Sequence, residues 1–274
     1  MIDFSVCIET AFGETERSFP DRVRAAADAG FRAVEIWDWW DKPLPELRSA
    51  LTETGTELHT LCVESWRDKC QLGDRQSHAL FLERLSRAAE VADELGTPKL
   101  VVLAGDCIAD LELSVQYDSV LDVLAAASDR LAGSNLQIVL EIVNREFEGP
   151  NALLQDSTTT LQLLRRLNRP NVKYLYDRYH AILNGEPLGW AIAGDMDLVG
   201  HIQAADVPGR HEFGTGEQDW VSELAWLLSA GYQGFVGIEA VPKSDSSRLH
   251  LEARAILEAA RATVAKQDSW IMTQ

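Results

Sequence analysis

Short apolar runs alternate with longer amphipathic runs along the whole chain. Short runs rich in β-branched or aromatic residues and bounded by turn residues predict buried strands, and the amphipathic runs predict helices. Strands are expected at Ile2–Cys7, Ala33–Trp37, Glu57–Val63, Leu100–Ala104, Leu136–Glu141, Val172–Asp177, Leu198–Gln203 and Phe235–Glu239. Helices are expected at Phe19–Ala29, Leu44–Thr54, Gln76–Leu95, Leu111–Leu131, Ser157–Leu167, Trp220–Ala230 and Ser247–Ala265, with the weakest pattern near Pro187–Asp195.

Eight strand and helix units in succession predict a closed (β/α)8 barrel, the TIM barrel of the α/β class. No linker or low-complexity stretch divides the 274 residues, so residues 1–274 are expected to form one domain. An open doubly wound sheet is the alternative architecture. It is disfavoured as a dinucleotide-binding fold, because Gly214-Thr-Gly216 lacks the further glycine of that motif and lies late in the chain.

Four polar residues stand at the ends of the last four predicted strands: Glu141, Asp177, Gln203 and Glu239. In a parallel barrel these strand ends meet at one mouth, where active sites lie. Three carboxylates and an amide at one point favour a hard divalent cation and also supply acid and base groups. Each residue alone could simply cap the next helix. As a group, they would place three repelling charges together with no cation to offset them.

Two further residues are candidates for binding a substrate at this mouth. His180 lies three residues beyond Asp177 and could donate a hydrogen bond to a substrate oxygen. Arg210 lies on the loop after the seventh strand, where a guanidinium could hold a carboxylate or a pair of hydroxyls. The alternative for Arg210 is a surface ion pair with Asp206 or Glu212.

Aromatic residues gather after the second and third predicted strands. The segment Trp37–Trp40 holds three tryptophans, and Trp66 follows the third strand. Such side chains can form the apolar wall of a sugar pocket, or they can pack loops together. Glu64 is a further pocket candidate, whereas His59 is expected to be an interior histidine.

The charge and the cysteines limit the classes of partner. The net charge of −18 repels nucleic-acid backbones and anionic membranes, so neither partner is expected. The four cysteines form no Cys-x-x-Cys pair and are expected to be reduced thiols. The N-terminus does not resemble a signal peptide, and no apolar run is long enough to span a membrane. These features predict a cytoplasmic protein.

The chain resembles the hydroxypyruvate isomerases of the xylose-isomerase-like barrel superfamily, which also contains ketose 3-epimerases. The resemblance covers the whole chain in layout and is specific from about Leu136 to Pro242. The resemblance rests on five motifs: Leu140-Glu-Ile-Val-Asn144, Tyr176-Asp-Arg-Tyr-His180, His201-Ile-Gln-Ala-Ala-Asp-Val-Pro-Gly-Arg210, Gly214-Thr-Gly-Glu217 and Gly237-Ile-Glu239. Epimerases of the superfamily usually carry histidine where this chain has Gln203. That difference favours the hydroxypyruvate and 2-oxo-tetronate isomerase branch.

The resemblance implies a set of roles. Glu141, Asp177, Gln203 and Glu239 would bind Mg²⁺ or Mn²⁺, and Glu141 and Glu239 would also transfer protons. His180 and Arg210 would contact the substrate, and further substrate contacts are expected from Glu64, Trp66 and Asn144. The residues after Glu141 and the tryptophan-rich loop depart from the family pattern, which leaves the substrate less defined than the chemistry.

The implied reaction is the isomerisation of a short ketose or hydroxy-keto acid to its aldose form through an enediolate. The alternatives are a ketose 3-epimerase and a keto-inositol-type dehydratase on the same barrel. A non-catalytic sugar-binding or metal-binding barrel is disfavoured, because binding does not require two carboxylates facing one carbon. A metal-dependent nuclease is disfavoured by the negative charge and by the absence of a histidine-rich cluster in the sequence. Homo-oligomer formation stays open.

Overall fold

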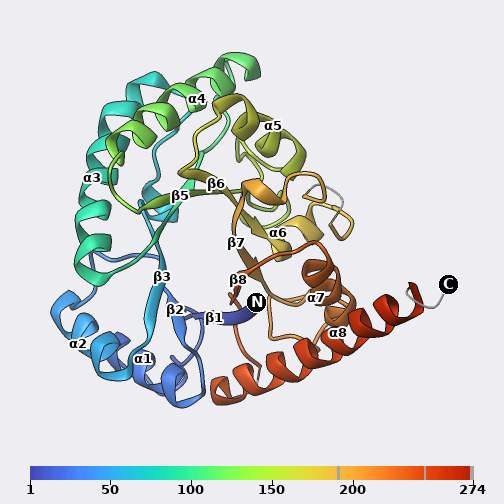
Figure 1. The fold of residues 1–274 in the computed structure, drawn as a ribbon. Helices are drawn as coiled ribbons and strands as arrows, with labels where there is room; N and C mark the ends of the chain where they lie inside the picture. Colours follow the sequence, from blue (N-terminus) through green and yellow to red (C-terminus); the bar gives the residue numbers. More distant parts are fainter. Residues whose placement is uncertain (190–191, 244, 272–274) are drawn as a thin grey trace.

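The eight strands form one closed parallel barrel, which lies inside a ring of helices (Figure 1). The computed structural model of the protein describes residues 1–189, 192–243 and 245–271. Each strand pairs in parallel with the next, and pairing of the last strand with the first closes the barrel. The predicted (β/α)8 barrel is therefore confirmed, and the open sheet is not formed.

All the predicted strands are present, and most of their ends differ from the prediction by one or two residues. The strands are β1 (Ile2–Cys7), β2 (Ala33–Glu35), β3 (Glu57–Cys62), β4 (Lys99–Leu103), β5 (Gln137–Glu141), β6 (Val172–Asp177), β7 (Val199–Ala204) and β8 (Gly234–Ile238). The helices are α1 (Phe19–Asp28), α2 (Leu44–Thr54), α3 (His78–Leu95), α4 (Leu113–Arg130), α5 (Ser157–Leu167), α6 (Arg178–Leu183), α7 (Trp220–Ser229) and α8 (Leu249–Ile271). Short 3-10 turns occupy Trp66–Asp68, Arg75–Ser77, Met196–Leu198 and Ser246–Arg248.

The sixth helix is the element that the sequence pattern placed wrongly. The described residues of Pro187–Asp195 do not form a helix, and residues 190 and 191 lie outside the described residues. Instead, α6 begins at Arg178, directly after β6. Asp177 closes the strand and caps the helix, because its Oδ1 accepts a hydrogen bond of 2.7 Å from the backbone N–H of Tyr179. With no loop between the two elements, the sequence carries no break that would mark the start of the helix.

The barrel separates two apolar regions. Alternate strand residues, such as Tyr174 and Tyr176 of β6, face outward and join the large core between the strands and the helices. Inside the barrel a small second cluster forms from Val101, Val139 and Leu175, with Cys62 packed against it. Only part of the interior is apolar, which leaves room for polar side chains.

The rest of the barrel interior holds a buried polar group, here called the interior cluster, of Ser5, Glu35, Thr60, His201 and Gln203. Their hydrogen bonds converge on the carboxylate of Glu35, which is 1% exposed. The ring of His59 lies 5.0 Å from that of His201, as expected for an interior histidine. A buried carboxylate needs several donors, and this cluster supplies them.

Cys7, Cys62, Cys70 and Cys107 are all unpaired. Among the described residues, none of the helices combines the length and the apolar character needed to cross a bilayer.

A buried ion pair joins α6 to α7. Arg178 donates from Nε and Nη2 to the two carboxylate oxygens of Glu223 at 2.9 and 2.8 Å, and both side chains are less than a tenth exposed. Arg178 also donates to the backbone carbonyl of Glu186 at 2.8 Å. The pair therefore anchors the short helix that carries His180.

We expect Arg178→Met to destabilise the protein by about 3–5 kcal/mol, because Glu223 would be left as an unpaired buried charge. The double variant Arg178→Met/Glu223→Leu should recover most of that loss, since it removes the buried charge as well. Urea unfolding of the three proteins measures the difference. A loss below about 1 kcal/mol in the single variant would show that the pair does not anchor α6.

Candidate active site

The two carboxylate oxygens of Asp177 have different surroundings, one at the start of α6 and the other at the mouth of the barrel. Its Oδ1 caps α6, whereas its Oδ2 is buried and has no hydrogen-bond partner among the described residues. This second oxygen lies 3.4 Å from Nε2 of His180 and 3.5 Å from Nη2 of Arg210. A buried oxygen without a hydrogen bond is costly, so Oδ2 is suited to a ligand bound in the mouth.

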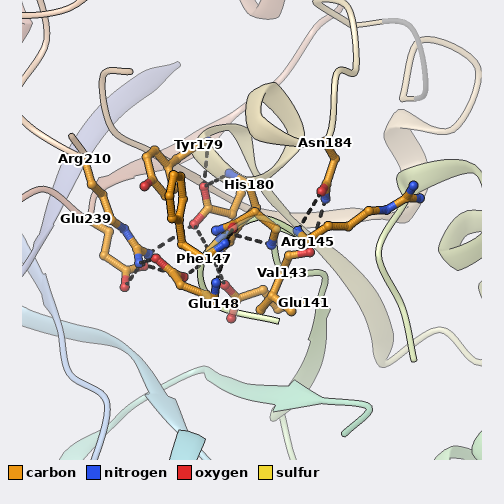
Figure 2. A network of polar contacts seen from close by, with 12 residues as sticks. Glu141, Val143, Arg145, Phe147, Glu148, Tyr179, His180, Asn184, Arg210 and Glu239 are labelled. Atoms are coloured by element: carbon orange, nitrogen blue, oxygen red, sulfur yellow. Dashed lines mark hydrogen bonds and ion pairs between the residues drawn. The ribbon is translucent and has the colours of Figure 1, made fainter. Parts of the chain in front are cut away.

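His180 lies among three carboxylates, as Figure 2 shows for two of them, Glu141 and Glu148. Its Nε2 is 3.6 Å from Glu141, 3.4 Å from Glu148 and 3.4 Å from Asp177. Its Nδ1 faces two donors, the side-chain amide of Asn144 at 2.9 Å and the Asn144 backbone N–H at 3.2 Å. Nδ1 is therefore the acceptor, and a neutral ring carries its proton on Nε2, toward the carboxylates. Burial lowers the pKa of His180, which favours this neutral form.

Asn144 supports the site from behind. The residue is fully buried, and its Oδ1 accepts hydrogen bonds from the backbone N–H groups of Phe147 at 2.8 Å and Glu148 at 3.3 Å. It therefore fixes both the ring of His180 and the loop that carries Glu148. A direct contact between Asn144 and a substrate stays a prediction, and Asn144 does not line the cavity described below.

Arg210 is the cation that joins the carboxylates of the mouth. Its Nη1 donates to both oxygens of Glu148 at 2.9 and 3.1 Å. Its Nη2 lies 3.0 Å from Glu239 and 3.5 Å from Asp177. The guanidinium also lies 4.9 Å from the ring centre of Tyr179. The fork of the guanidinium thus contacts three acidic residues at once, which a single ammonium group could not do in the same geometry.

Asp206 folds the loop that presents Arg210. The side chain is fully buried, and its Oδ2 accepts hydrogen bonds from the backbone N–H groups of Gly214 at 2.8 Å and Gly216 at 2.9 Å. Its Oδ1 accepts from the N–H of Val207 at 2.9 Å. The alternative of a surface ion pair between Arg210 and Asp206 is therefore wrong, because Asp206 binds its own loop and Arg210 points into the mouth.

Glu239 follows β8 directly and is only 4% exposed. Its Oε1 accepts a hydrogen bond of 2.9 Å from the indole Nε1 of Trp37, in addition to the contact with Arg210. The backbone N–H of Trp37 donates in turn to Glu9 at 3.0 Å, and Glu9 pairs with the buried Lys42 at 2.7 Å. One tryptophan of the Trp37–Trp40 segment is therefore part of the site.

The two strand-end glutamates resist ionisation. Burial raises the pKa of Glu141 well above its ordinary value, and the charges of Glu239 and Asp177 add to the effect. Burial also raises the pKa of Glu239 to about 8, with Arg210 opposing and Asp177 contributing. Carboxyl groups in such surroundings are suited to accept and donate protons near neutral pH.

A cavity of about 580 Å³ opens above these side chains. Its lining includes Trp37, Glu64, Trp66, Glu141, Glu148, His180, Arg210 and Glu239. The volume is in the range of small-molecule sites. The predicted pocket residues Glu64 and Trp66 do line it, but the carboxylate of Glu64 already pairs with Arg84 at 2.7 Å and accepts from the N–H of Cys70.

Gln203 lies in the barrel interior rather than in the lining of the cavity. It pairs in register with Asp177 on β6 and with Gly237 on β8. Its Nε2 donates to Glu35 at 2.8 Å, and its buried Oε1 has no hydrogen-bond partner among the described residues.

The residues that could hold a metal ion are rich in oxygen donors. One potential ligand atom from each of Glu141, Asp177 and His180 lies within 4.8 Å of the others. The buried oxygens that lack a hydrogen-bond partner among the described residues include Asp177 Oδ2 and Gln203 Oε1, which belong to two of the four predicted ligands. The crowding of buried carboxyl groups also fits a divalent cation that prefers oxygen ligands, because such an ion would stabilise their ionised forms. Binding of one ion by all four residues stays a prediction.

Sequence reasoning did not find two important acidic residues. Glu148 lies within a loop and is brought to the mouth by the bend that Asn144 holds, for which the sequence has no signal. Glu35 lies inside the apolar run Ala33-Val-Glu-Ile-Trp37. A charged residue within a buried strand needs buried partners, and this sequence signal could have identified it.

Comparisons with known proteins identify the family of the chain. The family model described as xylose isomerase-like TIM barrel matches residues 23–263. The chain belongs to this family. Among curated members of similar sequence, the putative hydroxypyruvate isomerase of Streptomyces coelicolor is 33% identical over 89% of this chain and 92% of its own. The 2-oxo-tetronate isomerase of Pectobacterium atrosepticum is 31% identical over 84% and 88%.

Solved structures also match the fold of this chain. The crystal structure of an AP endonuclease of family 2 from Brucella melitensis has a TM-score of 0.84 and 25% identity, and the match covers 91% of this chain and 96% of that one. The structure of an L-ribulose 3-epimerase has a TM-score of 0.79 and 18% identity, over 99% and 98% of the two chains. The second match shows the fold alone.

We expect Asp206→Asn to destabilise the protein by about 1–3 kcal/mol, because the new amide NH₂ cannot accept from the backbone N–H groups that it would face. The matched control is Asp219→Asn at the exposed start of α7, since asparagine caps a helix as well as aspartate does. Urea unfolding measures both. Equal, small effects of the two substitutions would contradict the role of Asp206 in folding the Arg210 loop.

Proposed function

We propose that the protein is a divalent-metal-dependent isomerase. It would interconvert a short ketose or hydroxy-keto acid, of the hydroxypyruvate or 2-oxo-tetronate type, with its aldose form. The observation that carries the proposal is the pair Glu141 and Glu239, two carboxyl groups at the ends of β5 and β8 that line one cavity. Such a pair is suited to move one proton between adjacent carbons.

The names of the relatives support an isomerase function for this chain. Proteins of 28–33% identity that cover most of its length include putative and named hydroxypyruvate isomerases and a 2-oxo-tetronate isomerase. The substrate class is proposed on the same basis, together with a cavity that suits a small molecule.

The metal would be Mg²⁺ or Mn²⁺, held by Glu141, Asp177, Gln203 and Glu239. When bound, such an ion stabilises the negative charge that develops on substrate oxygens as a carbon-bound proton leaves. The partnerless oxygens of Asp177 and Gln203 support this choice of ligands.

The proton steps belong to the two glutamates. One of them removes a proton from the hydroxyl-bearing carbon next to the carbonyl, which leaves an enediolate. The other supports return of a proton to the former carbonyl carbon, while the hydroxyl hydrogen passes to the former carbonyl oxygen. The substrate and product are isomers of equal oxidation level, so no redox cofactor is needed. Proton exchange with solvent returns both glutamates to their starting protonation states.

His180 and Arg210 would hold the substrate in place. Nε2–H of His180 points toward the carboxylates and can donate to a substrate oxygen, as inferred from its Asn144 contacts. Arg210 can bind a carboxylate or paired hydroxyls if the substrate displaces Glu148, with which it now pairs.

Incubation in heavy water with hydroxypyruvate and with a panel of three- to six-carbon ketoses and keto acids tests the function. Deuterium incorporation together with an aldehyde product supports the isomerase. Incorporation with inversion at C3 of a ketose would instead show a 3-epimerase, and loss of water would show a dehydratase. A nucleic-acid substrate, which the name of the Brucella melitensis protein suggests, is disfavoured by the net charge of −18.

We expect Glu141→Gln and Glu239→Gln each to abolish turnover while substrate still binds. An amide can coordinate through its oxygen but cannot accept the proton. Glu146→Gln is the matched control, because it makes the same change at an exposed position on the loop after β5. For each variant and the control, turnover is measured by an activity assay and substrate binding by calorimetry. Near-normal turnover in either variant would remove that glutamate from the mechanism.

We expect Arg210→Lys to lower kcat/KM by about tenfold or more, which corresponds to roughly 1.4 kcal/mol of transition-state stabilisation. A lysine cannot reproduce the forked contacts of the guanidinium. Arg145→Lys is the control, since Arg145 points away from the mouth (Figure 2). The metal content should be unchanged in both variants. Full activity of Arg210→Lys would contradict the role of the arginine in the pocket.

A further inference from the structure

Glu35 lies below the mouth, at the centre of the interior cluster, and touches none of the cavity surface. Its Oε1 accepts a hydrogen bond from Ser5 at 2.5 Å and is 2.9 Å from Nε2 of His201. Its Oε2 accepts from Nε2 of Gln203 at 2.8 Å and, more weakly, from Thr60 at 3.4 Å. Hydrogen-bonding groups from three other strands therefore converge on one carboxylate.

This arrangement determines which way the amide of Gln203 faces. A carboxylate that receives hydrogen bonds on both oxygens can only accept, so the NH₂ group of Gln203 must face it. The amide oxygen is then directed away from Glu35. That oxygen is buried and has no hydrogen-bond partner among the described residues, on a side chain that is 3% exposed.

The carboxylate of Glu35 is held from a further side by β8. A Cβ atom added at Gly237 would overlap both of its oxygens, so glycine is needed there for the carboxylate to fit. Gly237 is also the register partner of Gln203. Glu35 therefore cannot turn away from Gln203 without moving the strand that leads to Glu239.

We propose that Glu35 is a positioning residue that fixes the amide of Gln203 so that its oxygen is presented to a divalent cation at the mouth. The inference rests on the proposed metal site. Asp177, the register partner of Gln203 on β6, has the other partnerless buried oxygen of the site. The two oxygens belong to register partners on neighbouring strands, so they form a pair of ligand atoms for one cation. Glu35 fixes the orientation of the second ligand atom, the amide oxygen of Gln203.

Calorimetric titration of the metal-free, full-length protein with Mn²⁺ tests the inference. Glu35→Asp keeps the charge but withdraws the carboxylate by one methylene, so it should bind Mn²⁺ about tenfold more weakly than the unchanged protein. Ser5→Ala is the control, because it removes a hydrogen bond from the same carboxylate without touching Gln203, and it should leave Mn²⁺ affinity within about threefold. Thermal unfolding of each variant shows that it is folded.

A second pair of variants keeps the test decisive if Glu35→Asp does not fold. Glu35→Gln should weaken Mn²⁺ binding, because the amide of Gln203 can then face either way. The exchange Glu35→Gln/Gln203→Glu restores a donor against an acceptor, so it should bind Mn²⁺ more tightly than Gln203→Glu alone, which carries the same new charge at position 203 but faces Glu35 without a donor. Equal Mn²⁺ binding by these two variants would contradict the orienting role of residue 35.

The outcomes separate the two proposals. If the unchanged protein binds no Mn²⁺, the metal site fails and the role of Glu35 fails with it. If the unchanged protein binds Mn²⁺ and Glu35→Asp or Glu35→Gln binds it equally well, the role of Glu35 is overturned and the metal site stands.

Discussion

The structure depends on one electrostatic constraint, the gathering of buried carboxylates at the mouth of a closed barrel. Closure brings the ends of β5, β6 and β8 together, so Glu141, Asp177 and Glu239 cannot avoid one another. Burial makes their charges costly, and the raised pKa values of Glu141 and Glu239 express that cost. Arg210 offsets part of the charge by contacting both Asp177 and Glu239.

Several groups at the mouth are held by a buried partner that faces away from the cavity. Asn144 fixes the ring of His180, and Asp206 folds the loop of Arg210. Below the mouth, Glu35 accepts a hydrogen bond from the side-chain amide of Gln203. These supports are hydrogen bonds made in the dry interior, where a missing partner is expensive, so they hold the functional groups in narrow ranges of orientation. The cavity can therefore stay open to a small molecule while the functional groups around it keep their orientations.

The sequence predicted the barrel and the strand-end carboxylates because both follow from local patterns. Apolar runs with turn residues at their ends mark strands, and a polar residue such as Glu141 at the end of a run is visible in the sequence. The bend that brings Glu148 over the mouth depends on the side chain of Asn144, which no periodicity reveals. The start of α6 was missed because Asp177 ends a strand and caps a helix in the same position. Contacts between distant strands, such as Gln203 with Glu35, are set only when the barrel closes.

The proposed chemistry depends on one divalent cation bound by the oxygens of four strand ends. Anomalous X-ray scattering from crystals grown with Mn²⁺ tests this binding most directly. We predict one strong peak within coordination distance of the carboxylates of Glu141, Asp177 and Glu239 and of the amide oxygen of Gln203, with Nε2 of His180 left unbound. A peak coordinated by His180 in place of Gln203, or no peak at the mouth of the barrel, would show that the four strand ends do not bind the cation together.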